Sequence, residues 1–246
     1  MLKIQNLSKK YKNSDTFAVR DLNLEVGAGE ILGFIGPNGA GKSTTIKCMT
    51  GVLPYDQGSI TVCGHDLAAD PVGAKQNIGY VSDNHAVYEK LTAREYIQFV
   101  ADIYGVGPND RKTRTEKLLE TFELTDAYDK QISGYSHGMK QKICVIGALV
   151  HNPPLWILDE PITGLDPRSA HQLKELMREH CKQGNSVLFS SHILEIVEKL
   201  CAKIAIINKG EIKFSGDTDE LLASRGDASL EDLFLQITTA EKPQVE

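Results

Sequence analysis

The sequence lacks the long apolar runs that would carry a chain into or across a membrane. No stretch of its 246 residues approaches the ~20 consecutive apolar residues that a membrane-spanning helix needs. The N-terminus also lacks the apolar core of a secretion signal. We therefore expect this chain to have no membrane span of its own.

Paired cysteines and an excess of positive charge are missing as well. The five cysteines are odd in number and scattered, with no spacing typical of metal ligands: Cys48, Cys63, Cys144, Cys181 and Cys201. Such usage is typical of the reducing cytosol, where a free cysteine acts as a small buried hydrophobe. The net charge of −6 disfavours nucleic acid as the main ligand, because surfaces that bind it are usually basic. We expect a cytoplasmic protein with no nucleic-acid partner.

What the sequence does contain is a phosphate-binding motif. Residues 36–44 read Gly-Pro-Asn-Gly-Ala-Gly-Lys-Ser-Thr and match the pattern G-x-x-x-x-G-K-[ST]. An apolar run over 30–35 predicts a strand before the motif, and the unbroken stretch over 44–49 predicts a helix after it. The alternative is an ordinary glycine-rich turn, which these flanks disfavour. The motif predicts a site for a nucleoside triphosphate.

Each residue type in this motif has a physical role. The glycines let successive backbone N–H groups turn inward and cradle a phosphate at the helix N-terminus. Lys42 brings positive charge to the β- and γ-phosphates, and the Ser43 hydroxyl can bind a magnesium ion. The predicted nucleotide-binding residues of this loop are Gly36, Pro37, Asn38, Gly39, Ala40, Gly41, Lys42, Ser43 and Thr44.

The pattern of elements along the chain predicts an α/β fold. Strands are expected at 30–35, 59–63, 77–81, 155–158 and 186–189, with a hairpin over 203–208 and 211–214. Helices alternate with these strands, which indicates a mainly parallel sheet with helices on both faces. Residues 2–11 and 19–26 are expected to form an antiparallel flap. We expect one domain over 1–237, with a helical subdomain inserted at about 86–150, and a disordered polar tail over 238–246.

The first helix of the predicted insertion begins at a capping box, Thr92-Ala-Arg-Glu95. Apolar residues follow at steps of three and four: Tyr96, Phe99, Val100, Ile103 and Tyr104. This stripe predicts that most of these side chains pack in the core. Any that are exposed would mark a docking surface for a partner.

Two carboxylates follow the predicted strand at 155–158. A buried strand that ends in a carboxylate places that charge at the edge of the sheet where ligands of such folds bind. We expect Asp159 to hold magnesium, mainly through water, and Glu160 to orient or deprotonate the attacking water. The alternative is that the two acids only cap a helix. A base directly after the magnesium aspartate favours hydrolysis over transfer to a kinase acceptor.

Tyr11 stands at the end of the first predicted strand, ahead of a polar loop. An aromatic ring there could stack on an adenine base, a contact worth ~1–3 kcal/mol. An ordinary strand-end tyrosine is an equally good interpretation.

Taken together, these motifs resemble the nucleotide-binding subunit of an ABC transporter over nearly the whole chain. Besides the phosphate loop and the two carboxylates, residues 135–139, Tyr-Ser-His-Gly-Met, are similar to the family's signature Leu-Ser-Gly-Gly-Gln. Gly164-Leu-Asp166 corresponds to the family's D-loop, and Ser191-His192 to its switch histidine. Tyr11 falls where the family's adenine-stacking aromatic lies. The resemblance implies a P-loop NTPase fold with a RecA-like sheet, and ATP with Mg²⁺ as ligands.

The resemblance also implies a dimer in which two subunits close head to tail around two ATP molecules. The signature of one subunit, here Ser136 and Gly138, contacts the γ-phosphate held by the other. A helix N-terminus suits that contact, because free N–H groups and a positive dipole end meet the anion. By resemblance, His192 contacts the γ-phosphate and Asp166 shapes the dimer interface. Position alone favours a His192 that caps the helix expected after it, and the order of the motifs reverses that preference.

Two positions depart from the family pattern. Ser82-Asp83 replaces the family's usual glutamine after the strand at 77–81, and a carboxylate cannot donate an amide N–H. Either Asp83 acts through metal and water, or its loop mainly carries movement to a partner. His137 and Met139 alter the signature, and the sequence Tyr-Ser-His-Gly-Met-Lys-Gln looks like export-type members.

The function expected from the resemblance is an ATPase subunit that drives a separate transmembrane permease, an exporter, from the cytoplasmic face of the membrane. Its second ATP-binding subunit is another copy or a paralogue. One alternative is a soluble ABC-type ATPase that is not coupled to transport. A P-loop kinase or GTPase is a further alternative, but Asn208-Lys-Gly lacks the aspartate of a guanine-reading Asn-Lys-x-Asp motif.

Overall fold

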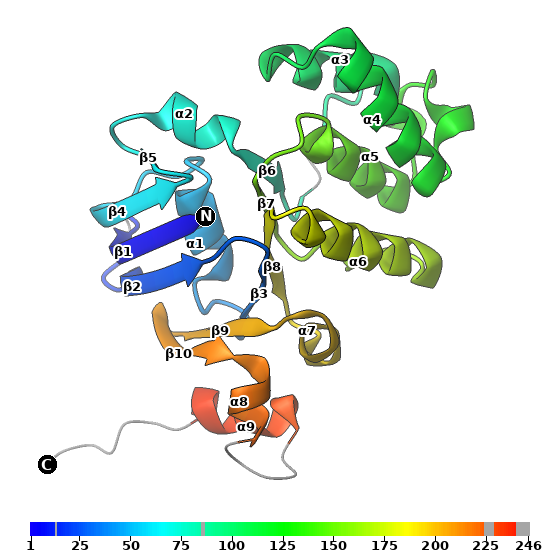
Figure 1. Ribbon diagram of the computed structural model, residues 1–246. Coiled ribbons are helices and arrows are strands. Elements are labelled where there is room, and N and C mark those ends of the chain that lie inside the picture. The colour runs from blue at the N-terminus through cyan, green and yellow to red at the C-terminus, as the bar shows by residue number, and fades with distance from the viewer. Residues whose placement is uncertain (13, 85–86, 224–228, 240–246) are drawn as a thin grey trace, which may run out of the picture.

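Two β-sheets and surrounding helices make up the fold of the computed structural model (Figure 1), which describes residues 1–12, 14–84, 87–223 and 229–239. The strands are β1 Leu2–Lys10, β2 Phe17–Val26, β3 Ile31–Ile35, β4 Gln57–Val62, β5 His65–Asp66, β6 Ile78–Val81, β7 Leu155–Leu158, β8 Ser186–Ser191, β9 Lys203–Asn208 and β10 Glu211–Asp217. The α-helices are α1 Lys42–Met49, α2 Pro71–Gln76, α3 Ala93–Ile103, α4 Pro108–Thr121, α5 His137–Leu149, α6 Pro167–Lys182, α7 Leu194–Leu200, α8 Thr218–Ala223 and α9 Leu230–Thr239. Two 3₁₀ turns, η1 Thr125–Ala127 and η2 Ile132–Gly134, join α4 to α5.

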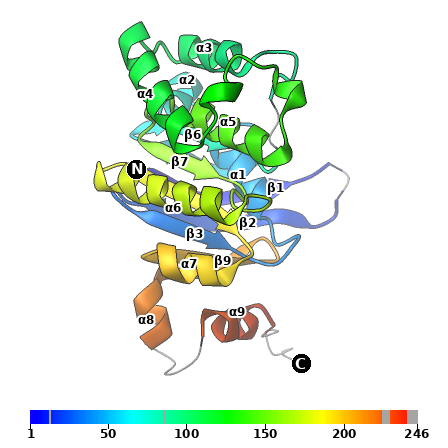
Figure 2. The same ribbon diagram turned by 90° about the vertical axis from the view of Figure 1, so that its right-hand side faces the viewer.

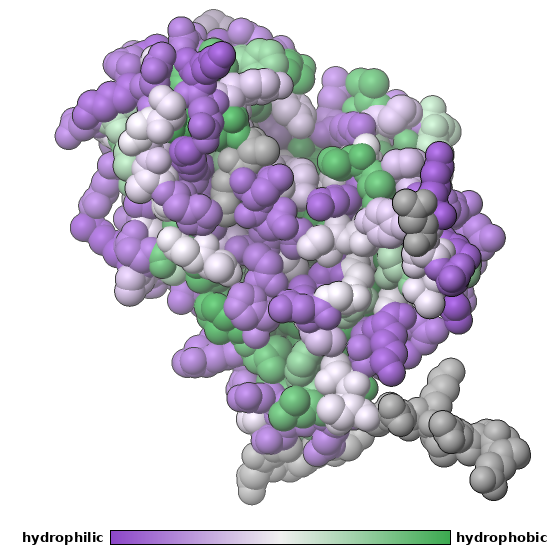
Figure 3. Space-filling model, turned by 180° about the vertical axis from the view of Figure 1, so that it is seen from behind, coloured by the Kyte–Doolittle hydropathy of each residue, from purple (hydrophilic) through white to green (hydrophobic). Residues whose placement is uncertain are grey.

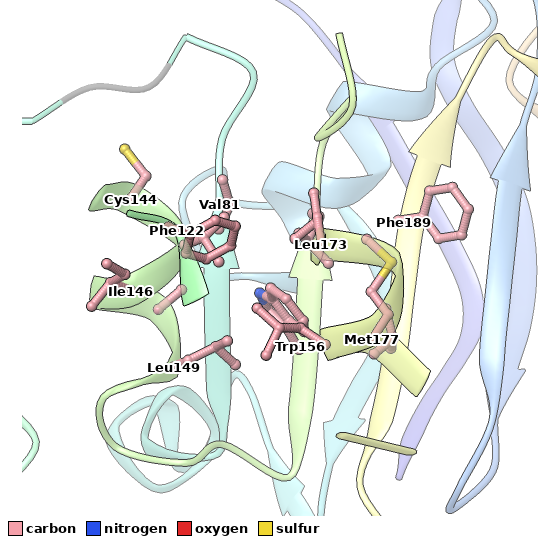
Figure 4. Close-up of a cluster of buried hydrophobic side chains, with 14 of the residues drawn as sticks. Val81, Phe122, Cys144, Ile146, Leu149, Trp156, Leu173, Met177 and Phe189 are labelled. Carbon is pink, nitrogen blue, oxygen red and sulfur yellow. The ribbon is translucent and has the colours of Figure 1, made fainter. Parts of the chain in front are cut away.

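The central sheet has the order β10-β9-β3-β8-β7-β6. Strands β9, β3, β8, β7 and β6 pair in parallel, and β10 pairs antiparallel with β9. Side chains along β7 alternate between two hydrophobic clusters, since successive residues of a strand point to opposite faces. Leu155 and Ile157 join the cluster on the α1 side, whereas Trp156 and Leu158 join the cluster on the α5 and α6 side (Figure 4). The predicted mainly parallel sheet with helices on both faces is confirmed.

The N-terminal sheet has the order β2-β1-β4-β5 and is antiparallel throughout. It confirms the predicted flap. Apolar side chains of β1, β2 and β4 pack against α1 and the central sheet in one buried cluster. In Figure 1, helix α1 lies between the two sheets, so both hold the helix that follows the phosphate loop.

The helical insertion lies between β6 and β7, which are neighbours in the central sheet. Helices α3, α4 and α5 form it, and together with α6 they cover the face of the sheet opposite α1 (Figures 1 and 2). The predicted capping box at the start of α3 is present: the Thr92 hydroxyl accepts from the Glu95 N–H, and the Glu95 carboxylate accepts from the Thr92 N–H. Within the described residues, no helix is long and apolar enough to span a bilayer.

Most of the predicted stripe on α3 is packed, and a remainder is exposed: Tyr96 and Val100 pack against the core and Tyr104 is half-buried. The buried residues of α3 are Ala93, Ile97 and Ala101, spaced at four-residue steps. Phe99 is 44% exposed and Ile103 is 61% exposed. Two of the three buried residues are alanines, which allows α3 to approach α5 closely, and the ring of Tyr96 lies directly over Gly147. The larger apolar residues of the stripe spread over a wider arc than this contact covers.

Elements that were not predicted include β5, α2, α8 and α9. Helix α9 buries Leu230 and Leu233 against α7 and the main core, so it belongs to the folded domain. It includes Thr238 and Thr239, and the Asn208 side chain donates to the Thr238 carbonyl at 2.8 Å. The prediction of a disordered tail from 238 is therefore wrong for these two residues, and 240–246 lie outside the described residues.

Hydrophobic residues also reach the surface at this lower end of the molecule (Figure 3).

Candidate functional site

The site forms where parallel strands of the central sheet end. Because the carboxyl ends of β3, β6, β7 and β8 lie at one edge, the segments that follow these strands meet there. These segments carry the phosphate loop, Asp83, the pair Asp159 and Glu160, and His192. The structure thus brings together predicted site residues that are up to about 150 positions apart in the sequence.

Close contacts explain the first and last glycines of the phosphate-loop motif. A β-carbon at Gly36 would lie 2.3 Å from the Ile207 carbonyl oxygen, and one at Gly41 would lie 2.5 Å from the Ala18 carbonyl oxygen. Gly41 also has a φ of 108°, a conformation that side chains other than glycine rarely adopt. The loop can therefore follow this path only with glycine at both positions.

Lys42 closes the phosphate loop from inside. Its ammonium donates to the Gly36 carbonyl at 2.6 Å and lies 3.4 Å from the Pro37 carbonyl. Burial lowers the pKa of this ammonium, and the nearby carboxylates of Glu160 and Asp159 oppose that shift. The carbonyl groups of the loop therefore hold the Lys42 ammonium at the pocket, where it can contact a bound anion.

Asp159 follows β7 and is completely buried. Its Oδ1 accepts a hydrogen bond from the Ser190 hydroxyl at 2.6 Å. Its Oδ2 is also buried and has no hydrogen-bond partner among the described residues. Burial raises the pKa of this carboxyl, and the hydrogen bond from Ser190 together with the nearby Ser43 hydroxyl opposes the rise.

An orphaned carboxylate oxygen beside a serine hydroxyl fits a magnesium ion, which prefers oxygen ligands and keeps several waters. In the described parts of the chain, no group of three or more His, Cys, Asp and Glu side chains forms a complete metal cage.

Glu160 has an unusual backbone and two specific partners. Its φ is 51°, in the left-handed region that is uncommon for residues other than glycine. Its N–H donates to the Ser190 hydroxyl at 2.9 Å, and its Oε2 lies 2.8 Å from Nδ1 of His192. The exposed fraction of the Glu160 side chain is 23%, against 56% for His192. His192 therefore contacts Glu160, while Ile193, the residue before α7, forms no side-chain cap.

Two adjoining pockets share Pro37, Asn38, Asp83 and Glu160. The first, of about 340 Å³, lies along the phosphate loop and includes Lys42 and Ser43. The second, of about 560 Å³, extends past Glu160 to a wall of six residues: His137, Thr163, Ser191, His192, Leu194 and Phe234. Asp83 faces both pockets, so its charge lies beside that of Glu160.

Tyr11 lies against the helix that follows the phosphate loop. Its hydroxyl is 3.2 Å from the Thr44 hydroxyl, and its side chain is 44% exposed. The ring therefore stands at the surface beside the loop. This position is compatible both with stacking on an adenine base and with an ordinary tyrosine at the end of a strand.

The predicted signature and D-loop residues cap helices near the site, and His137 of the signature lines the larger pocket together with Pro37 and Asn38. Ser136 caps α5 by accepting from the Met139 N–H, and Asp166 caps α6 by accepting from the Ser169 N–H at 3.0 Å. Ser136, Gly138 and Asp166 are not among the described residues that line the two pockets. Their predicted role in a dimer stays a prediction.

Sequence reasoning missed two residues next to the carboxylates. Ser190 bridges Asp159 and the Glu160 backbone, and Gln141 donates from its side-chain amide to the Pro161 carbonyl. A polar residue within a buried apolar stretch could have indicated either: Ser190 ends the run Val-Leu-Phe in β8, and Gln141 precedes the apolar part of α5.

The chain is similar to known proteins along most of its length. The family model for ABC transporter matches residues 19–163. The ABC transporter ATP-binding protein NatA of Bacillus subtilis (strain 168) is 34% identical over 96% of this chain and 97% of NatA. The linearmycin resistance ATP-binding protein LnrL of the same organism is 37% identical over 98% of this chain and 75% of LnrL. A solved ATP-binding subunit of an ABC transporter superposes with a TM-score of 0.91 at 34% identity, covering 96% of this chain and 99% of the other.

Proposed function

The chain belongs to the ABC transporter ATP-binding family, and from this premise we propose that it closes head to tail with a second ATP-binding subunit and drives a separate membrane permease. As a member of this family the chain is an ATPase, and we assign its residues to steps of ATP hydrolysis. One observation carries the assignment: Glu160, the base candidate, is hydrogen-bonded to His192 and lines the same pocket as Lys42.

In this proposal the phosphate loop binds ATP and orients it for attack. The loop N–H groups and the Lys42 ammonium bind the β- and γ-phosphates, where negative charge develops as the terminal phosphoryl group leaves. Glu160 orients the attacking water and takes up its proton, and His192 holds the Glu160 carboxylate in place and contacts the γ-phosphate. The strands hold these groups before ATP arrives, so little reorganisation is needed during the reaction.

Magnesium fits the site at Ser43 and Asp159, and when bound it supplies positive charge to the phosphate oxygens. The orphaned Oδ2 of Asp159 and the Ser43 hydroxyl are the groups that would hold it. We assign Asp83 to water beyond the first ligands, since it is exposed at the pocket wall.

In the head-to-tail dimer, the signature of one subunit would meet the γ-phosphate held by the phosphate loop of the other. The exposed N-terminus of α5, with Ser136 as its cap, offers free N–H groups to an anion held by a second subunit. Because ATP then contacts both subunits only in the closed state, binding shifts the population toward closure. The partner is a second copy or a paralogue.

The permease is proposed to dock on the helical insertion. Tyr88, Phe99 and Ile103 are exposed there, and the rings of Tyr88 and Phe99 pack edge to face with centroids 5.6 Å apart. Exposed aromatic groups of this kind mark protein interfaces. Docking would hold the chain on the cytoplasmic face of the membrane. The name of LnrL, a resistance protein, and the altered signature support export as the direction of transport.

The test of this proposal uses the Glu160→Gln variant. We expect it to bind ATP as the wild-type chain does and to lose turnover. A tagged form, incubated with ATP in detergent-solubilised membranes, should co-purify a polytopic membrane protein. Undiminished hydrolysis would overturn the assignment of Glu160. Recovery of soluble partners alone would favour the soluble ABC-type ATPase instead.

A further inference from the structure

The loop that carries Glu160 has a backbone that needs support. Glu160 adopts the left-handed conformation, and the residue after it is Pro161, whose ring restricts the conformation of the residue before it. Such conformations persist at functional sites where the surrounding structure holds them on several sides. On one side, the Ser190 hydroxyl accepts from the Glu160 N–H. The other side of the loop faces α5.

On this other side, Gln141 in the second turn of α5 supports the loop. Its side chain is completely buried, and its Nε2 donates to the Pro161 carbonyl oxygen. Because a carbonyl can only accept, the amide nitrogen must face Pro161. Its Oε1 is buried and unpartnered within the described part of the chain. A buried amide whose oxygen is unpaired lowers the stability of the fold, so packing alone does not explain a glutamine at this position. The hydrogen bond to Pro161 is what distinguishes Gln141 from an apolar residue here.

Two further contacts join the start of α5 to the same loop. A β-carbon at Gly164 would lie 2.9 Å from Cδ2 of the His137 ring, so this ring packs directly on Gly164. The Lys142 ammonium lies 3.9 Å from Oδ2 of Asp166. Residues 137, 141 and 142 of α5 therefore contact the loop at residues 164, 161 and 166.

We infer that Gln141 is a positioning residue: it holds the Pro161 carbonyl so that the adjacent Glu160 keeps the conformation needed to act on water. This inference rests on the proposed role of Glu160 as base. It adds a consequence for the proposed dimer. Helix α5 touches the nucleotide of the partner subunit through its N-terminus and steers the base of its own site through Gln141, so each site senses the other.

The test replaces Gln141 with methionine, which has a similar volume but no N–H donor. We expect kcat for ATP hydrolysis to fall by about 10- to 100-fold, the scale for a slightly misplaced reacting group. The dissociation constant for ATP should stay within about twofold, because the phosphate loop is untouched. The matched control is Gln76→Met, at an exposed position at the end of α2, which should leave both quantities unchanged. An unchanged kcat in Gln141→Met would overturn the inference.

A second background separates this inference from the proposed function. In Glu160→Gln, where turnover is already lost, adding Gln141→Met should leave ATP-dependent dimerisation unchanged by sedimentation. A weakened dimer would mean that Gln141 acts on the signature surface rather than on Glu160, which overturns the inference. If the Glu160→Gln variant hydrolyses ATP at the wild-type rate, the proposed role of Glu160 is overturned, and this result does not depend on Gln141.

If Gln141→Met fails to fold, the contact between His137 and Gly164 provides an independent route. Gly164 has a φ of 83°, so Gly164→Ala strains the backbone as well as placing a methyl group against the ring, and it should lower kcat; only the part due to the ring can be relieved by a change at His137. Adding His137→Gly opens that space, and the double variant should hydrolyse ATP faster than Gly164→Ala alone. A double variant no faster than the single one would contradict the role of α5 in holding this loop.

Discussion

The hydroxyl of Ser190 joins the two carboxylate residues of the site: it donates to Oδ1 of Asp159 at 2.6 Å and accepts from the N–H of Glu160 at 2.9 Å. One side chain in β8 therefore orients the proposed magnesium ligand and the backbone of the proposed base. This arrangement leaves Oδ2 of Asp159 directed to other partners.

Ser190→Ala removes both bonds. We expect the free energy of unfolding to fall by about 2 kcal/mol, because two buried polar groups lose their partner. We also expect kcat to fall by roughly tenfold and the midpoint of a magnesium titration of hydrolysis to rise. Ser186→Ala is the control: it removes one buried hydrogen bond, to Gly27, at the opposite end of the same strand. Equal losses of kcat in the two variants would mean that Ser190 acts only through stability.

His192→Ala leaves the Glu160 carboxylate without its side-chain partner at 2.8 Å. We expect kcat to fall by about 100-fold, the scale for losing one group that stabilises the transition state. ATP affinity should change little, since Lys42 and the loop backbone remain. Steady-state hydrolysis together with equilibrium binding of ATP measures both. A matching fall in affinity would show that His192 mainly binds substrate.

Lys42→Met tests the cation inside the phosphate loop. Loss of its charge-assisted hydrogen bonds should weaken ATP binding by about 10- to 100-fold. Because burial disfavours the charged form of Lys42, we expect the fold to tolerate the change. Isothermal titration with ATP and urea unfolding give the two numbers. Lys47→Met, on the same helix α1, is the control, and equal effects would argue against a specific role for Lys42.

Stability should depend on pH through two buried histidines. Burial lowers the pKa of His151 and of His180 to about 4, from an ordinary value of 6.5. The unfolded chain therefore binds more protons between these values, so stability is complete above pH 6.5 and is lost as the pH falls toward 4. Each histidine contributes roughly 3 kcal/mol at most.

The measurement is urea unfolding at pH 7.5, 6 and 5. His180 packs edge-on against Trp156, and no described residue partners its buried Nε2. His180→Leu should therefore lose less stability on acidification than the wild-type chain. His171→Gln, on the exposed face of α6, should follow the wild-type curve. Parallel curves for His180→Leu and wild type would rule out this source of pH dependence.

Much of the site could be predicted because its residues sit at the ends of strands with strong local signals. The glycines, Lys42 and Ser43 form one contiguous motif, and Asp159 follows four apolar residues, so the sequence alone places them on one edge of a sheet. Ser190 and Gln141 could not be assigned in this way, because their partners lie 31 and 20 residues away and depend on how β8 and α5 pack.

The same limit explains the differences in the fold. Periodicity indicates an apolar stripe on α3 but does not show which of its members stay exposed. Phe99 and Ile103 do, because the buried side of α3 is the line of Ala93, Ile97 and Ala101. Helix α9 shows apolar residues at helical spacing, Leu230, Leu233, Phe234 and Ile237, yet the prediction assigned no element there. Its burial depends on α7, which a local pattern does not reveal.

The attachment of the helical insertion has a mechanical consequence. The chain leaves the sheet after β6 at the site edge and returns before β7 at the opposite edge, because the two strands are parallel neighbours. A four-residue strand is about 13 Å long, so the two covalent attachments are that far apart. Between these attachments α5 packs against β6 in the main hydrophobic cluster, so the insertion is held along the length of the strand, and its attachment at the site edge lies beside Asp83.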